Sequence, residues 1–152
     1  MMRIERDDLS RPAVAALVDY HLREMHAHSP ACHVFALDSS GLSHADVTMW
    51  TAWDDADLLG MGAMKRLDDR HGELKSMRTV PVALRRGVAR ALLDHMIAEG
   101  RARGYARLSL ETGRTAPFAP AHALYRAAGF VECGPFADYS DTGFSRYFTL
   151  DL

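Results

Sequence analysis

The stretch of residues 73–100 constrains the fold of this chain more than any other part of its sequence. Alternating polar and apolar residues over 73–80 predict a strand that ends at Pro81. Apolar residues spaced three to four apart from Val88 onward predict an amphipathic helix, which follows a short turn at Gly87. The first N–H groups of a helix lack intrahelical partners and carry partial positive charge. The sequence therefore predicts an anion site at this turn.

Small residues and arginines surround the turn in a pattern that suits a pyrophosphate. Gly87 and Ala89 leave the backbone amides open to close approach, while Arg85, Arg86 and Arg90 add positive charge around them. The Gly-Lys-Ser/Thr end of a P-loop is missing, and so is the three-glycine spacing of a dinucleotide fingerprint. We interpret the turn as a pyrophosphate cradle of another kind.

Length and charge favour one domain over residues 1–152, with a hydrophobic content of 48% that suits a globular protein. A net charge of -2 argues against nucleic acid or an anionic membrane as partner. No apolar run approaches the ~20 residues of a membrane span, and the first ten residues lack a signal-peptide core, so we expect a cytoplasmic protein. Cys32 and Cys133 lie far apart without a CxxC pattern, so we expect free thiols instead of a disulfide or zinc site.

The hydrophobic pattern of the whole chain predicts a mixed α/β (α+β) fold. Because the helix from Val88 joins strands 73–80 and 106–112, this crossover should make the two strands parallel. Gly60 and Gly62 are expected to mark a bulge or close packing within a strand. The strands are expected at 2–6, 46–53, 58–67, 73–80, 106–112, 130–133 and 143–150. Two further helices are expected, one at 121–128 and one that begins at Pro12. In the helix from Pro12, Ser10 is the expected N-terminal cap and His21 is expected to be a core histidine.

Two motifs resemble those of the GNAT superfamily of N-acetyltransferases. The cradle LRRGVA, residues 84–89, resembles the family's acyl-CoA motif Gln/Arg-x-x-Gly-x-Gly/Ala, with Leu84 in place of the usual Gln or Arg. Residues 124–130 match a second signature, Leu-Tyr followed by three residues and Gly-Phe, although Phe118 stands where Asn is common. The blocks GELKSMRT, LSLETG, FAPAHALYRAAGF and CGPFADY are similar to those of a bacterial subgroup of this family.

The resemblance implies a GNAT-like fold, with a mostly antiparallel central sheet, one splayed parallel strand pair and flanking helices. It implies acetyl-CoA as cosubstrate and no metal. The free backbone of the splayed strand would bind the pantetheine amides, and the cradle would bind the pyrophosphate. The residues implied to bind acetyl-CoA are Met77, Arg78, Thr79, Leu84, Arg85, Arg86, Gly87, Val88, Ala89 and Arg90.

Tyr125, Glu73 and Glu111 are the candidate catalytic residues. Tyr125 occupies the position of the family's general acid, and a phenol with a pKa near 10 stays protonated at neutral pH; the alternative is that Tyr125 only packs. Glu73 and Glu111 are candidate general bases. The alternatives are a solvated strand-edge carboxylate for Glu73, an ion pair with Arg107 or Arg114 for Glu111, and water as the base.

The histidines at positions 26, 28 and 33 allow two interpretations. Together with Cys32 they suggest a metal site, but no further carboxylate or thiolate has supportive spacing. A loop that lines an acceptor pocket is the favoured interpretation. The residues expected to shape this pocket are His26, His28, Asp138 and Tyr139.

We therefore expect an N-acetyltransferase that transfers the acetyl group of acetyl-CoA to a primary amine of a small molecule or peptide, by direct attack in a ternary complex. The alternative is a non-catalytic acyl-CoA-binding sensor, because a fold can keep its ligand site without turnover. A nucleic-acid-binding module is disfavoured by the acidic net charge. A homodimer through the C-terminal strands is also expected.

Overall fold

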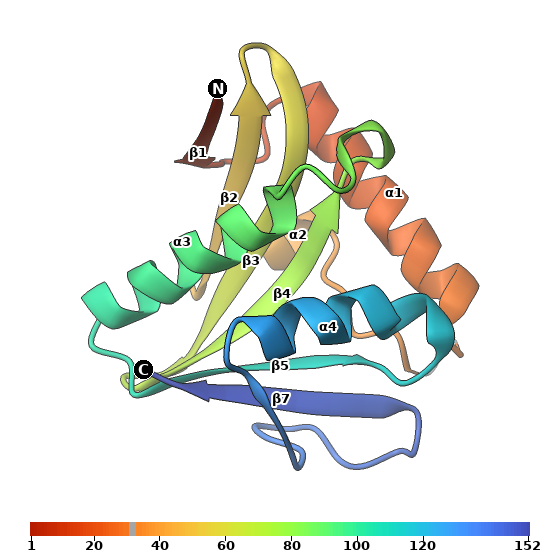
Figure 1. Cartoon of the computed structure of the whole chain (residues 1–152), viewed down its shortest axis with the longest axis vertical. Helices are drawn as coiled ribbons and strands as arrows, with labels where there is room; N and C mark the ends of the chain where they lie inside the picture. The colour runs from red at the N-terminus through yellow and green to blue at the C-terminus, as the bar shows by residue number, and fades with distance from the viewer. Residues whose placement is uncertain (31–32) are drawn as a thin grey trace.

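The computed structural model describes residues 1–30 and 33–152 and contains a seven-stranded sheet in the order β1-β2-β3-β4-β5-β7-β6 (Figure 1). The expectation of a free thiol at Cys32 lies outside the described residues, whereas Cys133 is a free, partly buried thiol. The described helices include none with the length and apolar character that crossing a membrane requires. The elements are β1 (Met2–Arg6), α1 (Pro12–His28), α2 (Ser39–Leu42), β2 (Val47–Asp54), β3 (Asp57–Asp68), β4 (His71–Thr79), η2 (Pro81–Ala83), α3 (Val88–Ala102), β5 (Arg107–Gly113), η3 (Ala116–Phe118), α4 (Ala119–Ala127), β6 (Val131–Cys133) and β7 (Ser145–Asp151).

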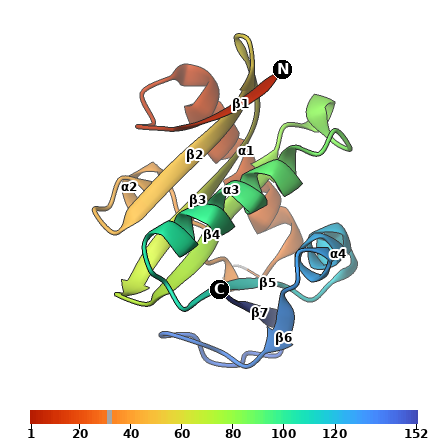
Figure 2. The same cartoon turned by 60° about the vertical axis from the view of Figure 1, so that its left-hand side comes forward.

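Helices cover both faces of this sheet. Figures 1 and 2 show α3 and α4 on one face and α1 and α2 on the other. The apolar side of α3 buries Leu92, Leu93 and Met96 against the sheet, because these residues recur at helical spacing. On the other face, α1 buries Val14 and Val18 in a second core cluster. The three-layer arrangement confirms the predicted α/β class with flanking helices.

The parallel pair β4–β5 separates after only four residue pairs. Its register runs from His71 opposite Arg107 to Leu74 opposite Leu110 and ends there, although β4 continues to Thr79. Figure 1 shows the two strands diverging. The facing backbone edges beyond this point have no strand partner, so the predicted splay is confirmed.

A bulge in β4 lies just past this point. Between the β3 residues Met61 and Ala63, the pairing with β4 shifts from Arg78 to Lys75, so one β3 residue opposes two of β4. Ser76 within the bulge has a φ of 56°. Bulges bend a strand and re-aim its side chains. The bulge therefore turns the end of β4 away from β5.

Two strand glycines allow α3 to pack closely on β3. A Cβ at Gly60 would lie 2.9 Å from Val88 Cγ1, and a Cβ at Gly62 would lie 2.8 Å from Met96 Cε. Close packing at both positions, together with the pairing shift next to Gly62, confirms the expectation for these glycines. This contact holds the first turn of α3 beside the end of β4.

The expected cap of α1 at Ser10 is wrong. The capping position is Arg11, which makes no side-chain capping hydrogen bond. Ser10 Oγ donates instead to Asp8 Oδ1 at 2.5 Å. The Arg11 side chain forms ion pairs with Glu5 in β1 and with Asp7 in the segment between β1 and α1.

Candidate active site

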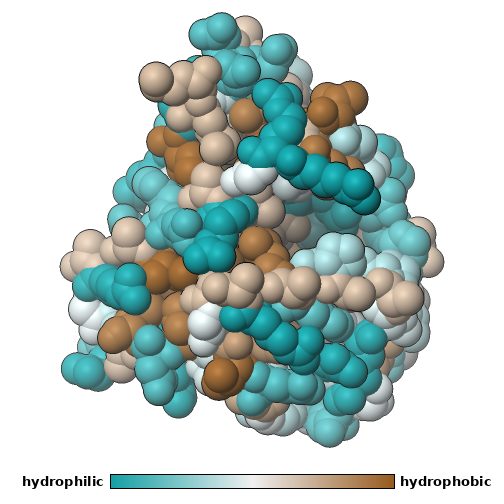
Figure 3. Space-filling model, in the orientation of Figure 1, coloured by the Kyte–Doolittle hydropathy of each residue, from teal (hydrophilic) through white to brown (hydrophobic). Residues whose placement is uncertain are grey.

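A cleft of about 610 Å³ runs from the start of α3 through the gap between β4 and β5 to the end of α1. Its volume falls in the range of small-molecule sites, roughly 300–1,000 Å³. Figure 3 shows the surface hollowed between the turn that precedes α3 and helix α4. The predicted site residues that line the cleft are Glu73, Met77, Arg78, Thr79, Leu84, Arg85, Gly87, Val88, Ala89, Arg90, Glu111 and Tyr125.

The first turn of α3 presents open backbone amides to the cleft. Gly87 is the capping residue, with a φ of 79°, and no side chain caps the helix. A Cβ at Gly87 would meet no atom within 4 Å, so the approach to these amides is unobstructed. Arg85 and Arg90 line the same end of the cleft. The start of α3 is therefore open to a ligand, and its role as an anion cradle stays a prediction.

Arg86 does not take part in the lining of this cradle. Its Nη2 lies 3.7 Å from Asp54 Oδ2, at the tip of the β2–β3 hairpin. Both side chains are more than a third exposed, so the pair contributes little stability. The sequence placed Arg86 beside the cradle because it is adjacent in the chain, whereas the fold brings in a carboxylate from 32 residues earlier.

Tyr125 lies where α4 crosses the splayed strands. Its hydroxyl donates to Met77 Sδ at 3.9 Å, and its ring packs near Phe130 and Phe148. Burial, with a smaller contribution from Glu111, raises the pKa of Tyr125 to about 12. Tyr125 thus packs in the core and also presents a protonated hydroxyl beside the cleft.

The negative charge of the Glu73 carboxylate is balanced by neighbouring side chains. It is 3% exposed on β4, accepts a hydrogen bond from Tyr139 Oη at 2.5 Å, and lies 3.2 Å from Lys75 Nζ. The alternative of a solvated strand-edge carboxylate is wrong, because β4 is central in the sheet and the Glu73 side chain is buried and hydrogen-bonded to Tyr139. Burial and the nearby Glu73 raise the pKa of Tyr139.

Glu111 has no cation within ion-pair distance among the described residues. It follows the last β4–β5 pair and accepts one hydrogen bond, from Ser145 Oγ at 2.7 Å. The expected alternative, an ion pair with Arg107 or Arg114, is wrong: Arg114 Nε donates to the Ser145 carbonyl, and Arg107 lines a different pocket. Burial raises the pKa of Glu111 above its ordinary range.

The side chain of Arg78 turns toward α1. Its Nε donates to His21 Nδ1 at 2.9 Å, and its Nη2 lies 3.7 Å from Met25 Sδ. Burial, then the Arg78 charge, lowers the pKa of His21 to about 3, so this imidazole is neutral. The sequence suggested only a backbone role for Arg78 and a core position for His21, and no local signal connects the two.

The end of α1 and the following loop line the far end of the cleft. His28 lies there with its Nε2 3.1 Å from Glu24 Oε2, and the His33 ring stacks 5.8 Å from Phe144. His26 is not part of the lining. Residues 1–30 and 33–152 contain no group of three potential metal ligands, and Cys32 lies outside these ranges.

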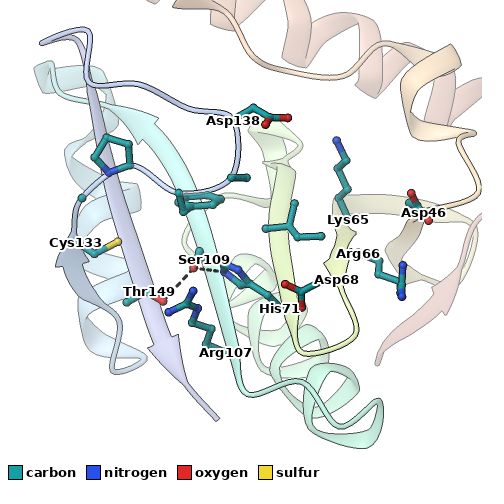
Figure 4. Close-up of a pocket in the computed structure, with 15 residues that line it drawn as sticks. Asp46, Lys65, Arg66, Asp68, His71, Arg107, Ser109, Cys133, Asp138 and Thr149 are labelled. Atoms are coloured by element: carbon teal, nitrogen blue, oxygen red, sulfur yellow. Dashed lines mark hydrogen bonds between the residues drawn. The ribbon is translucent and has the colours of Figure 1, made fainter.

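A second pocket, of about 660 Å³, lies beneath residues 134–138 (Figure 4). A chain of hydrogen bonds joins His71, Ser109 and Thr149 on its floor. Asp138, which was expected in the acceptor pocket, lines this second pocket instead. The second pocket contains neither the cradle nor the open strand edges, so the cleft is the candidate active site.

The model of the acetyltransferase (GNAT) family matches residues 14–130. The chain belongs to this family. It is 49% identical over 152 residues to the uncharacterized N-acetyltransferase YedL of Escherichia coli (strain K12), covering all of this chain and 96% of that protein. It is 48% identical to the uncharacterized N-acetyltransferase YsnE of Bacillus subtilis (strain 168), covering 99% of this chain and 100% of that one.

Solved structures of other acetyltransferases share the fold. An acetyltransferase from Streptococcus agalactiae superposes with a TM-score of 0.75 at 21% identity, covering 99% of this chain and 98% of that one. A GNAT family acetyltransferase from Elizabethkingia anophelis, with acetyl-CoA bound, superposes with a TM-score of 0.67 at 14% identity, covering 99% and 98%. These likenesses confirm the predicted GNAT fold.

Because His21 is held neutral, the stability of this GNAT protein should depend on pH. In the unfolded chain His21 takes up a proton below pH about 6.5, whereas in the folded chain its pKa is about 3. The stabilisation is complete above pH 6.5 and is lost as pH falls toward 3. We expect His21 to lower the free energy of unfolding by about 1 kcal/mol between pH 7 and pH 5.5.

Urea unfolding at the two pH values measures this effect. His21→Gln should remove that part of the difference, and His44→Gln, at an exposed histidine, should retain it. An unchanged difference in His21→Gln would contradict the neutral imidazole.

Proposed function

We propose that this protein is an acetyl-CoA-dependent N-acetyltransferase that acts on a primary amine of a small molecule or peptide, by direct attack in a ternary complex. One observation carries the proposal: a single cleft joins the open amides of α3, the unpaired edges of β4 and β5, and the Tyr125 hydroxyl. Membership of the acetyltransferase family supports acyl transfer, and the Elizabethkingia relative has acetyl-CoA bound.

In this proposal the chain holds acetyl-CoA mainly through backbone groups. The amides at Gly87–Ala89 bind the pyrophosphate, with Arg85 and Arg90 adding charge. The edge of Met77–Thr79 that faces β5 is unpaired, so its N–H and C=O groups are available to the pantetheine amides. Leu84 is 59% exposed and lines the cleft, so it offers an apolar contact at the position where the family motif has Gln or Arg.

Acetyl transfer needs a neutral amine, a polarised carbonyl and a protonated leaving group. When bound, acetyl-CoA supplies the thioester. A backbone N–H on the free edge of β4 polarises the carbonyl, and Tyr125 donates a proton to the departing sulfur. Glu111 accepts the proton of the amine, directly or through water. Glu73 is less suited to that role, because Lys75 and Tyr139 already engage it.

Isothermal titration with acetyl-CoA and with CoA, followed by a thiol-release assay over a panel of amines, tests the proposed function. We expect binding of both nucleotides and thiol release with at least one amine. Gly87→Asp should weaken binding at least about tenfold, because it places an anion at the cradle, while Gly134→Asp, at an open surface position, should not. Tight binding without release for any amine would favour the sensor, and no binding would contradict the cradle.

Replacement of Tyr125 by Phe should separate binding from turnover. We expect a loss of roughly 10²-fold or more in the rate constant for thiol release, with a dissociation constant for acetyl-CoA within about twofold of the parent. Because the pKa of Tyr125 is about 12, the parent should keep its activity up to pH 10. Tyr105→Phe, at a buried tyrosine outside the cleft, is the matched control. Full turnover in Tyr125→Phe would rule out the acid role.

Glu111→Gln should lower the rate constant for acetylation by roughly 10²-fold or more. The parent's rate should fall as pH drops through the raised pKa of Glu111, because the base must be ionised. This fall is the acidic limb of the rate–pH profile, and it should be absent in the variant. Rate–pH profiles of thiol release provide the measurement. Glu73→Gln, the neighbouring compensated carboxylate, should retain the limb. A larger rate loss in Glu73→Gln than in Glu111→Gln would reverse the assignment.

A further inference from the structure

The acceptor side of the cleft contains a cation without a carboxylate partner. No carboxylate of the described residues lies within 4.0 Å of the Arg78 guanidinium, whose protein contacts are His21, the Met25 sulfur and, at 5.7 Å, the Tyr20 ring. Burying a charge is costly unless an opposite charge accompanies it. Among the carboxylates, Glu24 stabilises the Arg78 charge by longer-range attraction, and Glu24 is itself hydrogen-bonded to His28.

His21 positions Arg78 without neutralising it. A neutral imidazole accepts the Nε hydrogen of Arg78 and fixes the plane of the guanidinium, whereas a carboxylate at the same place would cancel its charge. The hydrogen bonds of the Arg78 side chain use Nε and Nη2. The guanidinium has five N–H groups in a planar fork, so an edge of it remains for a ligand that lies in the cleft.

Glu111 is the complementary group on the opposite strand. It lines the same cleft and accepts a hydrogen bond only from Ser145 within the described chain. Lys75, the nearest cation to act on it, is held by Glu73 and Tyr139. Both charges act on the pKa of Tyr125: burial raises this pKa most, Glu111 raises it further, and Arg78 lowers it. Arg78, Glu111 and Tyr125 all line the same cleft, so both unmatched charges are within reach of one ligand there.

Three buried polar atoms of the same cleft also lack partners among residues 1–30 and 33–152. They are Ser29 Oγ, His33 Nδ1 and Ser76 Oγ. Ser76, only 8% exposed, lies in the β4 bulge between Lys75 and Arg78 in sequence. Buried polar groups are nearly always hydrogen-bonded. Each of these atoms is covered by protein, so they show that the wall of the cleft is polar here and do not themselves contact a ligand.

We propose that the acceptor is an amino acid whose amine lies at Glu111 and whose carboxylate lies at Arg78. This inference rests on the proposed acetyltransferase function and names the substrate class for it. The amine gives a proton to Glu111, its nitrogen forms the new C–N bond with the acetyl carbon, the C–S bond breaks, and the sulfur leaves as a thiol with the proton of Tyr125. Glu111 then releases its proton to solvent, and the Tyr125 phenolate takes one up from solvent, so both residues return to their starting states. The products are an N-acetylamino acid and CoA.

The aromatic walls of the cleft indicate which amino acids fit best. Phe35, Phe118 and Phe144 line it together with the stacked His33 ring. Such a surface favours an apolar or aromatic side chain on the acceptor. L-phenylalanine and L-methionine are therefore the first probes.

The experiment compares each of these amino acids with its carboxamide and with its decarboxylated amine. Thiol release with acetyl-CoA gives kcat and KM for each, and titration in the presence of CoA gives binding without turnover. We expect the amino acid to exceed both analogues in kcat/KM by about tenfold or more, mainly through KM, because a charge-assisted pair to Arg78 is lost in the analogues. O-Phosphoethanolamine tests whether a phosphate serves as well.

Arg78→Met should abolish the preference for the carboxylate, and Arg78→Lys should restore part of it, while the dissociation constant for acetyl-CoA stays within about twofold. Arg101→Gln, on the exposed end of α3, is the control. Any of four outcomes would overturn the inference. The first is an equal kcat/KM for the amino acid and the amine, and the second is a preference for the carboxylate that survives Arg78→Met. The others are a better reaction with O-phosphoethanolamine and the failure of all twenty amino acids to react. Release with simple amines alone would leave the acetyltransferase standing, whereas failure to bind acetyl-CoA would reject both.

Discussion

The structure depends on the early end of the β4–β5 pairing. Past Leu74 and Leu110 the two strands have no hydrogen bonds to each other, and the bulge at Ser76 keeps them from closing. Helices pack beside the gap: α3 lies close to β3 over Gly60, and α4 runs alongside β5 (Figure 1). An unpaired backbone edge inside a protein is normally unfavourable. Here the unpaired edge lines the cleft, where its N–H and C=O groups are open to a ligand.

Charge is distributed unevenly around this gap. Glu73 is fully engaged by Tyr139 and Lys75, so it contributes to the fold and offers little to a ligand. Within residues 1–30 and 33–152, Glu111 and Arg78 have no oppositely charged partner, and this difference underlies the proposed roles of the two groups. Leaving charges unmatched lowers stability. The large apolar clusters on both faces of the sheet offset that cost.

Much of the binding machinery was predictable because it depends on neighbours in the sequence. The cradle at Gly87 follows from a strand, a turn and a helix start, and the parallel pair follows from the handed crossover through α3. The bounds of β4 and α4 differ from expectation by about two residues, since tertiary hydrogen bonds and a preceding 3-10 turn set the ends of elements.

Sequence alone determined the family, the turn at Gly87 with the helix start after it, and the position of Tyr125, because each is a local pattern of residue types at fixed spacing. Only the tertiary structure decided which charges are neutralised. Arg86 leaves the cradle for Asp54, Glu73 is buried by a tyrosine 66 residues later, and Arg78 meets His21 from 57 residues earlier. The physical reason is that electrostatic compensation depends on distance and burial in three dimensions, which no local pattern encodes.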